Sequence, residues 1–116
     1  MLDWGYSVLT ERQRRQRIIE LLVELEQQLR VLGWWSDNAP TAAQLSSELP
    51  FCIDTLVFEQ WLQFIYIPRL TEILANSRPL PRQSGVAAMA EEVLDQSSIA
   101  VDQLIDCLRQ LDELFG

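Results

Sequence analysis

Residues that could carry out chemistry are scarce in this chain of 116 residues. Histidine and lysine are both absent, so all nine basic residues are arginines. Their absence excludes Ser-His-Asp and Cys-His nucleophile pairs, Schiff-base lysines and most zinc sites. The glycines are too scattered to build a phosphate-binding loop. We therefore predict no catalytic residues, no cofactor and no metal site, and we expect that the protein is not an enzyme.

One acidic cluster, Glu91, Glu92 and Asp95, resembles the carboxylate groups used in catalysis or metal binding. Di-metal sites in helical bundles repeat a Glu-x-x-His motif on several helices, which a chain without histidine cannot supply. An all-carboxylate magnesium or calcium site is the alternative. Most such acids are surface or ion-pairing residues, so we interpret this cluster as structural.

The most apolar run, "FEQWLQFIYIPRLTEIL" at residues 58–74, contains Pro68 followed directly by Arg69. Proline removes a backbone donor and disfavours helical geometry in the residue before it, so we predict a kink. On a regular helix, Arg69 falls between Phe58 and Leu62 on the buried face. An unpaired charge cannot stay there, because its burial is very costly.

Two arrangements would avoid an unpaired, buried charge on Arg69. Either Pro68 turns the following segment so that Arg69 reaches water, or Arg69 stays inside and pairs with an acid from another helix. We expect the second outcome, since the planar guanidinium suits a buried pair. Glu91 or Glu92 is the expected acceptor, and a pocket beside the pair is the candidate site.

Two further groups of residues could contact a partner. The segment "ERQRRQR" could follow a phosphate backbone through Arg12, Arg14, Arg15 and Arg17, although such charge blocks are usually solvated overhangs. A protein-binding surface could combine an exposed tryptophan with a polar helix stripe. Its candidate residues are Trp34, Trp35, Glu59, Gln60 and Gln63.

Apolar spacing predicts the elements that would position these residues. Leucine and isoleucine recur at four-three spacing over residues 10–32 and 99–115, which indicates two amphipathic helices. A long buried helix is predicted from Asp54, its expected N-cap, to about Ala75, and another helix over 86–94 with Ser84 as a candidate cap. The pair Thr41 and Gln44 predicts a short helix in the first connector. The fold class is therefore all-α: a four-helix bundle in a single domain, 1–116, with a proline-kinked second long helix.

Part of this sequence resembles the YqcC-like family of small bacterial helical proteins. The resemblance lies in "PFCIDTLVFEQWLQFIYIPRLTEIL", then "PLP", then "AAMAEE", within residues 50–92. Family members usually read "DTM" and "APMAEE", where this chain has Leu56 and Ala88. The resemblance implies an all-helical domain of unknown function and an association with tRNA pseudouridine synthase C.

The net charge and the hydropathy of the chain limit which partners and which cellular location we expect. The net charge is −8, which disfavours general nucleic-acid and anionic membrane binding and favours a basic partner. No apolar run reaches the length of a membrane span, and no secretory signal pattern precedes residue 18, so we expect a cytoplasmic protein. The preferred function is a non-catalytic interaction or accessory protein with a protein partner. The alternative is an RNA-associated accessory protein that contacts tRNA or a tRNA-modifying enzyme.

Overall fold

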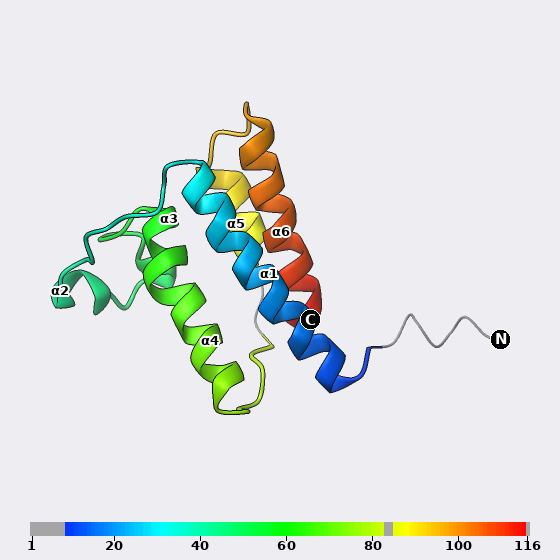
Figure 1. Ribbon diagram of the computed structural model, residues 1–116. Helices are drawn as coiled ribbons and strands as arrows, with labels where there is room; N and C mark the ends of the chain where they lie inside the picture. The colour runs from blue at the N-terminus through cyan, green and yellow to red at the C-terminus, as the bar shows by residue number, and fades with distance from the viewer. Residues whose placement is uncertain (1–8, 83–84, 116) are drawn as a thin grey trace.

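The computed structural model describes residues 9–82 and 85–115, and within these ranges every regular element is helical. The predicted all-α bundle is confirmed. Its second long helical segment consists of α3, a π-helix and α4, which follow one another without a break (Figure 1). The elements in chain order are α1 (Glu11–Val31), α2 (Ala42–Leu45), a 3-10 turn (Pro50–Cys52), α3 (Phe58–Trp61), the π-helix (Leu62–Tyr66), α4 (Ile67–Ala75), α5 (Val86–Val93) and α6 (Ile99–Phe115).

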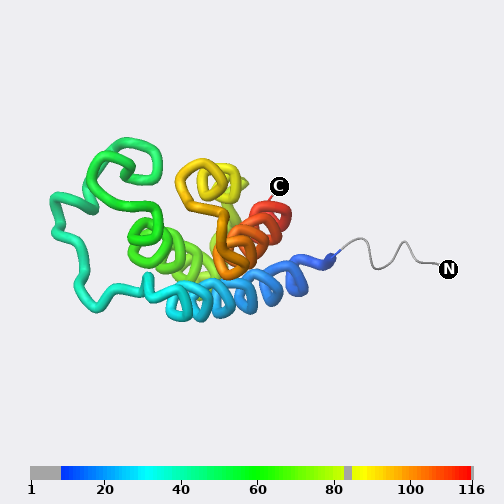
Figure 2. Tube along the Cα trace, turned by 90° about the horizontal axis from the view of Figure 1, so that it is seen from above, coloured from blue at the N-terminus to red at the C-terminus, as the bar shows by residue number. Residues whose placement is uncertain are grey.

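The core lies where the long helices meet. Helix α1 packs along α6, α5 packs on α6, and α4 packs against α1. Viewed from above, the connector between α1 and α3 lies on the side of the molecule away from α6 (Figure 2). The predicted apolar seams of α1 and α6 face each other inside, and their fully buried members include Ile18, Leu21, Leu25, Leu29, Leu104, Leu108 and Leu111.

Helix α1 begins and ends at local signals in its sequence. At its start, the Thr10 hydroxyl accepts from the Gln13 N–H at 3.1 Å, and the Gln13 side chain accepts from the Thr10 N–H at 3.0 Å. At its end, Gly33 adopts a left-handed conformation with φ 76°, which glycine tolerates at no steric cost. The same reciprocal cap, between Thr41 and Gln44, begins α2 as predicted.

The predicted start of the second long helix at Asp54 is wrong. Helix α3 begins at Phe58, after Val57, whose N–H donates to the Gln60 side chain at 3.1 Å. The preceding residues fold into the 3-10 turn and a further turn, so they cannot extend the helix backward. Asp54 is exposed there and accepts from the Ser47 hydroxyl at 2.5 Å instead of capping a helix.

Helix α5 receives its N-terminal cap from a distant part of the chain. Its N-cap residue is Gly85, with φ 108°, and the Ala87 N–H donates to Asp112 Oδ2 of α6 at 2.9 Å. The predicted cap, Ser84, lies outside the described residues. Val93, at the end of the helix, is 45% exposed.

None of the helices in residues 9–82 and 85–115 combines the length and apolar character that crossing a bilayer requires.

Candidate functional site: an aromatic cavity beside the π-helix

A change of helical register decides which side chains the second long helix buries. The N–H of Ile67 donates to the carbonyl of Leu62, five residues back, whereas an α-helix would use the residue four back. Each such widened turn holds about one extra residue, which rotates the remainder of the helix by roughly 100°. On a regular α-helix, Arg69 would occupy a buried position. Because of the rotation, Leu70 occupies it instead and is only 3% exposed.

The predicted buried ion pair of Arg69 with Glu91 or Glu92 is wrong. Arg69 is exposed and forms no salt bridge with any residue of the described chain. Glu91 instead pairs with Arg109 of α6 at 3.3 Å, and Glu92 is exposed. The structure therefore has the alternative outcome, with Arg69 in water. The physical reason is the π-helix before Pro68, which turns Arg69 away from the core.

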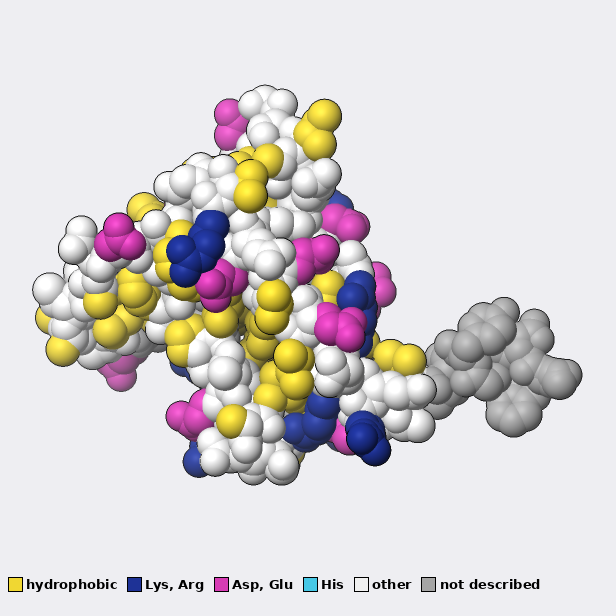
Figure 3. All heavy atoms as spheres, viewed as in Figure 1, with side chains coloured by type: hydrophobic (Ala, Val, Ile, Leu, Met, Phe, Trp, Pro, Cys, Tyr) yellow, Lys and Arg dark blue, Asp and Glu magenta, His cyan; other side chains and the backbone are white. Residues whose placement is uncertain are grey.

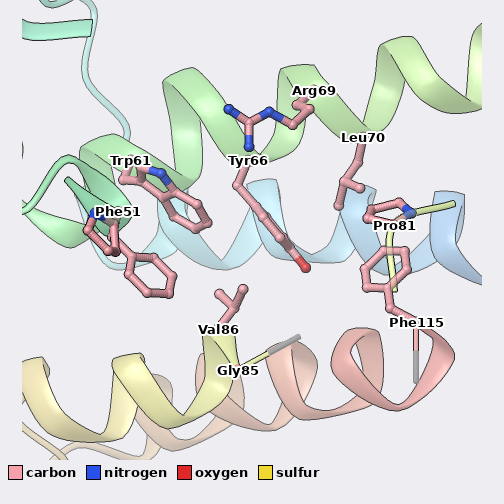
Figure 4. Close-up of a pocket in the computed structure, with 10 residues that line it drawn as sticks. Phe51, Trp61, Tyr66, Arg69, Leu70, Pro81, Gly85, Val86 and Phe115 are labelled. Carbon is pink, nitrogen blue, oxygen red and sulfur yellow. The ribbon is translucent and has the colours of Figure 1, made fainter. Parts of the chain in front are cut away.

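A cavity of about 460 Å³ lies where a pocket was expected, beside Arg69, but its walls differ from the prediction. It opens between the α3–α4 segment and the N-terminal end of α5 (Figure 4). Pro68, Glu91 and Glu92 do not line it. The residues that do are Pro50, Phe51, Trp61, Tyr66, Arg69, Leu70, Pro81, Gly85, Val86 and Phe115.

Aromatic rings in contact form one wall of this cavity. The ring centroids of Phe51 and Trp61 are 4.7 Å apart at a steep angle, and those of Trp61 and Tyr66 are 5.3 Å apart. Phe51 reaches this position through a left-handed backbone with φ 58°, and Cys52 follows with φ 50°. Such conformations cost a bulky residue on the order of 1–3 kcal/mol, and they cluster at functional sites.

Tyr66, which lines the cavity, carries a buried hydroxyl. Tyr66 is 7% exposed, and its hydroxyl has no hydrogen-bond partner among the described residues. Burial raises the pKa of this phenol above its ordinary value, and the negative charges of Asp112 and Cys107 raise it further. The hydroxyl therefore stays protonated and can donate. A second buried oxygen without a partner, Asp112 Oδ1, belongs to the carboxylate that caps α5.

The predicted protein-binding surface is taken up by internal contacts. Gln63 is 6% exposed, and its amide bonds to both the N–H and the carbonyl of Ser36 at 2.8 Å. Both tryptophans of the connector are half-buried against the core, so the expectation of one exposed tryptophan is wrong. Trp35 also lies under the Arg30 guanidinium, 4.6 Å from its ring centroid. The Gln60 side chain accepts a hydrogen bond from the Val57 N–H at the start of α3, and Glu59 is half-buried.

Two arginines of the predicted phosphate-contacting segment already bond to other residues of this chain. Arg15 pairs with Glu11 at 3.0 Å and donates to the Arg78 carbonyl at 2.7 Å. Arg17 pairs with Glu20 and donates to Gln110 of α6 at 2.9 Å. Arg12 is exposed and Arg14 is half-buried. Any phosphate contact by this segment would therefore begin with Arg12 and Arg14.

A second hollow, with mostly aliphatic walls, runs between α1 and α4. Figure 3 shows apolar side chains gathered on this face. The groove holds about 360 Å³, and its rim includes Ile19 and Val23, which are 43% and 54% exposed. The lining residues are Ile19, Leu22, Val23, Glu26, Ile67, Thr71, Leu74 and Ala75.

Chemically, the cavity and the groove are equipped for binding. Within residues 9–82 and 85–115, no group of three or more His, Cys, Asp or Glu side chains is placed to hold a metal ion. Sequence reasoning singled out Arg69 but missed Phe51, Tyr66 and Phe115. Pro68 was the available signal of an irregular helix, because sharp kinks occur at proline or at π-helical turns, but it did not indicate which residues the irregularity would bury.

This arrangement defines a class: a small all-helical bundle with an aromatic cavity and an aliphatic groove in its described part. The chain belongs to the family described as tRNA pseudouridine synthase C, whose model matches residues 17–114.

Two relatives are similar to this chain over nearly their whole length. An uncharacterized protein of Haemophilus influenzae is 32% identical over 102 residues, which cover 88% of this chain and 92% of that protein. The uncharacterized protein YqcC of Escherichia coli is 35% identical over 95 residues, covering 82% and 87% of the two chains. The solution NMR structure of YqcC matches with a TM-score of 0.77 at 33% identity, covering 88% of this chain and 87% of that chain.

A third relative is much longer. A protein of Pectobacterium carotovorum named tRNA pseudouridine synthase C is 32% identical over 69 residues. The match covers 60% of this chain but only 18% of that protein, so most of the Pectobacterium protein lies outside it.

Proposed function

We propose that the protein is a non-catalytic interaction domain that binds a tRNA pseudouridine synthase. The observation that carries this proposal is the long Pectobacterium relative, in which the matching segment is 18% of a polypeptide named tRNA pseudouridine synthase C. Two domains in one chain meet at a high effective concentration, so weak contacts between them suffice. The same domain encoded as a separate chain would require an intermolecular contact surface for the same partner.

Charge supports this choice of partner. An enzyme that acts on tRNA needs a basic surface to hold the phosphate backbone. This chain carries a net charge of −8, which attracts such a surface and speeds the encounter. The same charge weighs against direct tRNA binding by the chain itself, and two of the four candidate arginines already have internal partners.

The groove between α1 and α4 is the contact surface that we assign to the synthase. Its aliphatic walls and its length along two helices suit an amphipathic helix of the partner, laid into the groove by its apolar face. Glu20 on α1 and Glu72 on α4 place carboxylates on the two helices that form it, each in a surface ion pair with an arginine of this chain that a basic partner would have to replace. A partner helix with basic flanking residues would match them.

Binding of purified protein to purified tRNA pseudouridine synthase C from the same organism tests this proposal by calorimetry. We expect binding that weakens with salt and is lost in the double variant Ile19→Glu/Val23→Glu. The matched control is Val31→Glu/Ile99→Glu, because these residues are 81% and 77% exposed and lie outside the groove. Equal loss in both double variants, or no binding of the unaltered protein, would overturn the proposal.

The RNA-associated alternative predicts a different result. In that case the chain alone would bind tRNA with a strong salt dependence, and Arg12→Ala/Arg14→Ala would abolish this binding. Such binding without any affinity for the synthase would replace the present proposal.

A further inference from the structure

The aromatic cavity beside the π-helix is separate from the groove between α1 and α4, and the two share no lining residue. Its volume, about 460 Å³, is in the range that holds small organic ligands. An inference about this cavity therefore stands independently of the proposed synthase contact.

Three backbone irregularities converge on this cavity. The π-helix ends at Tyr66, the left-handed backbone of Phe51 carries another wall residue, and Gly85 is left-handed with φ 108°. π-Helical turns and left-handed bulky residues are rare, costly, and concentrated at functional sites. Their combined effect is to present Phe51, Trp61 and Tyr66 to one space.

The charged side chains at the cavity have one sign. Among the residues that the structure describes, no acidic side chain lines it, and the one cationic side chain that does is Arg69, exposed on α4. Figure 4 shows the Arg69 side chain on the helix above the rings, while the Tyr66 hydroxyl points toward the α5 and α6 side. That hydroxyl is buried, so a ligand in the cavity meets the Tyr66 ring and not its hydroxyl. The cavity thus offers flat apolar walls and a cation near its mouth.

We propose that this cavity binds a small aromatic anion: a free planar ring compound with an oxyanion group, carboxylate or phosphate, at one end. The ring stacks against Trp61 and its neighbours, since aromatic faces favour offset and edge contacts with a further ring. The guanidinium of Arg69 binds the oxyanion through its fork of N–H donors.

Two probes separate these contributions, with dissociation constants measured by NMR titration of the full chain. 2-Naphthoate carries the carboxylate, and 2-naphthol lacks it. We expect 2-naphthoate to bind more tightly than 2-naphthol, with shifts at the amides of Trp61, Tyr66 and Val86.

One substitution assigns the oxyanion contact. Arg69→Gln should weaken 2-naphthoate binding about tenfold and leave 2-naphthol unchanged. Arg12→Gln, an exposed arginine on α1 outside the cavity, is the matched control and should change nothing.

Several results would overturn the proposal. These are the absence of saturable binding, shifts that map to the α1–α4 groove, or an affinity for 2-naphthoate that Arg69→Gln leaves unchanged. If Arg69→Gln abolishes binding of the synthase while no probe binds, the cavity instead receives a side chain of the protein partner, and the small-molecule proposal is wrong. Loss of the synthase contact through the groove variants alone leaves this inference unaffected.

Discussion

Gln63 holds the connector between α1 and α3 onto the helical core. In the part of the chain that the structure describes, it is the one amide or charged side chain that is buried, at 6% exposure. Its amide nitrogen donates to the Ser36 carbonyl at 2.8 Å, and its amide oxygen accepts from the Ser36 N–H at 2.8 Å. A single side chain thus satisfies both backbone groups of a residue 27 positions away.

The substitution Gln63→Ala removes both bonds at once. Each hydrogen bond contributes about 1 kcal/mol net, and the buried side-chain atoms contribute on the order of another 1 kcal/mol through packing. Ser36 is half-buried, so water can partly replace the lost partner, which keeps the total at the lower end. We expect a loss of about 2–3 kcal/mol, or a melting temperature lower by roughly 8–12 °C for a domain of this size.

Urea unfolding followed by circular dichroism measures this loss, and amide hydrogen exchange localises it. The midpoint should fall at an unchanged slope, and the Ser36 amide should lose its protection. Gln27→Ala is the matched control, because Gln27 is exposed on α1 and should change stability by less than about 0.5 kcal/mol. A midpoint equal to that of the control, with Ser36 still protected, would refute the reasoning.

Three more predictions concern a helix end, a remote cap and alkaline stability. Ser77 follows α4 with φ 52°, so Ser77→Gly should stabilise the protein by about 0.5–1 kcal/mol, and a lower urea midpoint would contradict this. Asp112→Ala removes the acceptor of the Ala87 N–H and should cost about 1–2 kcal/mol, with faster exchange at Ala87; unchanged exchange there would reject the cap. Burial, and then the charge of Glu24, raises the pKa of Cys107 to about 12, and burial also raises that of Tyr66. The folded state therefore keeps protons that the unfolded chain loses above about pH 9, so stability is full below that pH and falls as pH rises toward 12. Urea midpoints at pH 8 and pH 10.5 measure this fall, which Cys107→Ala should reduce; an equal fall in the variant would contradict the assignment.

Local sequence signals predicted the helices whose ends depend on near neighbours. The caps at Thr10 and Thr41 each join residues three apart, and the buried seams of α1 and α6 repeat every three or four residues. Interactions of that range are complete within one or two helical turns, so they can be read without knowing the rest of the fold. The all-α class and the order of its elements followed from them.

The candidate site needed contacts between residues far apart in the chain. The regular helical wheel failed after Tyr66, because a π-helical turn before Pro68 inserts one residue and exchanges Arg69 for Leu70 in the core. That turn leaves no unique mark in the sequence. The ion pair between Glu91 and Arg109 likewise depends on tertiary structure, because it forms only where α5 and α6 lie side by side.

The sequence by itself determined that the chain is all-α, which segments contain the long helices and where α2 begins, since these depend on the spacing of apolar residues and on neighbours within four residues. Only the tertiary structure decided that Gln63 faces Ser36, that Asp112 caps α5, and that the aromatic rings of Phe51 and Tyr66 line one cavity. The physical reason is that each of these contacts joins segments between 15 and 27 residues apart, brought together by the packing of α3–α4, α5 and α6 around α1.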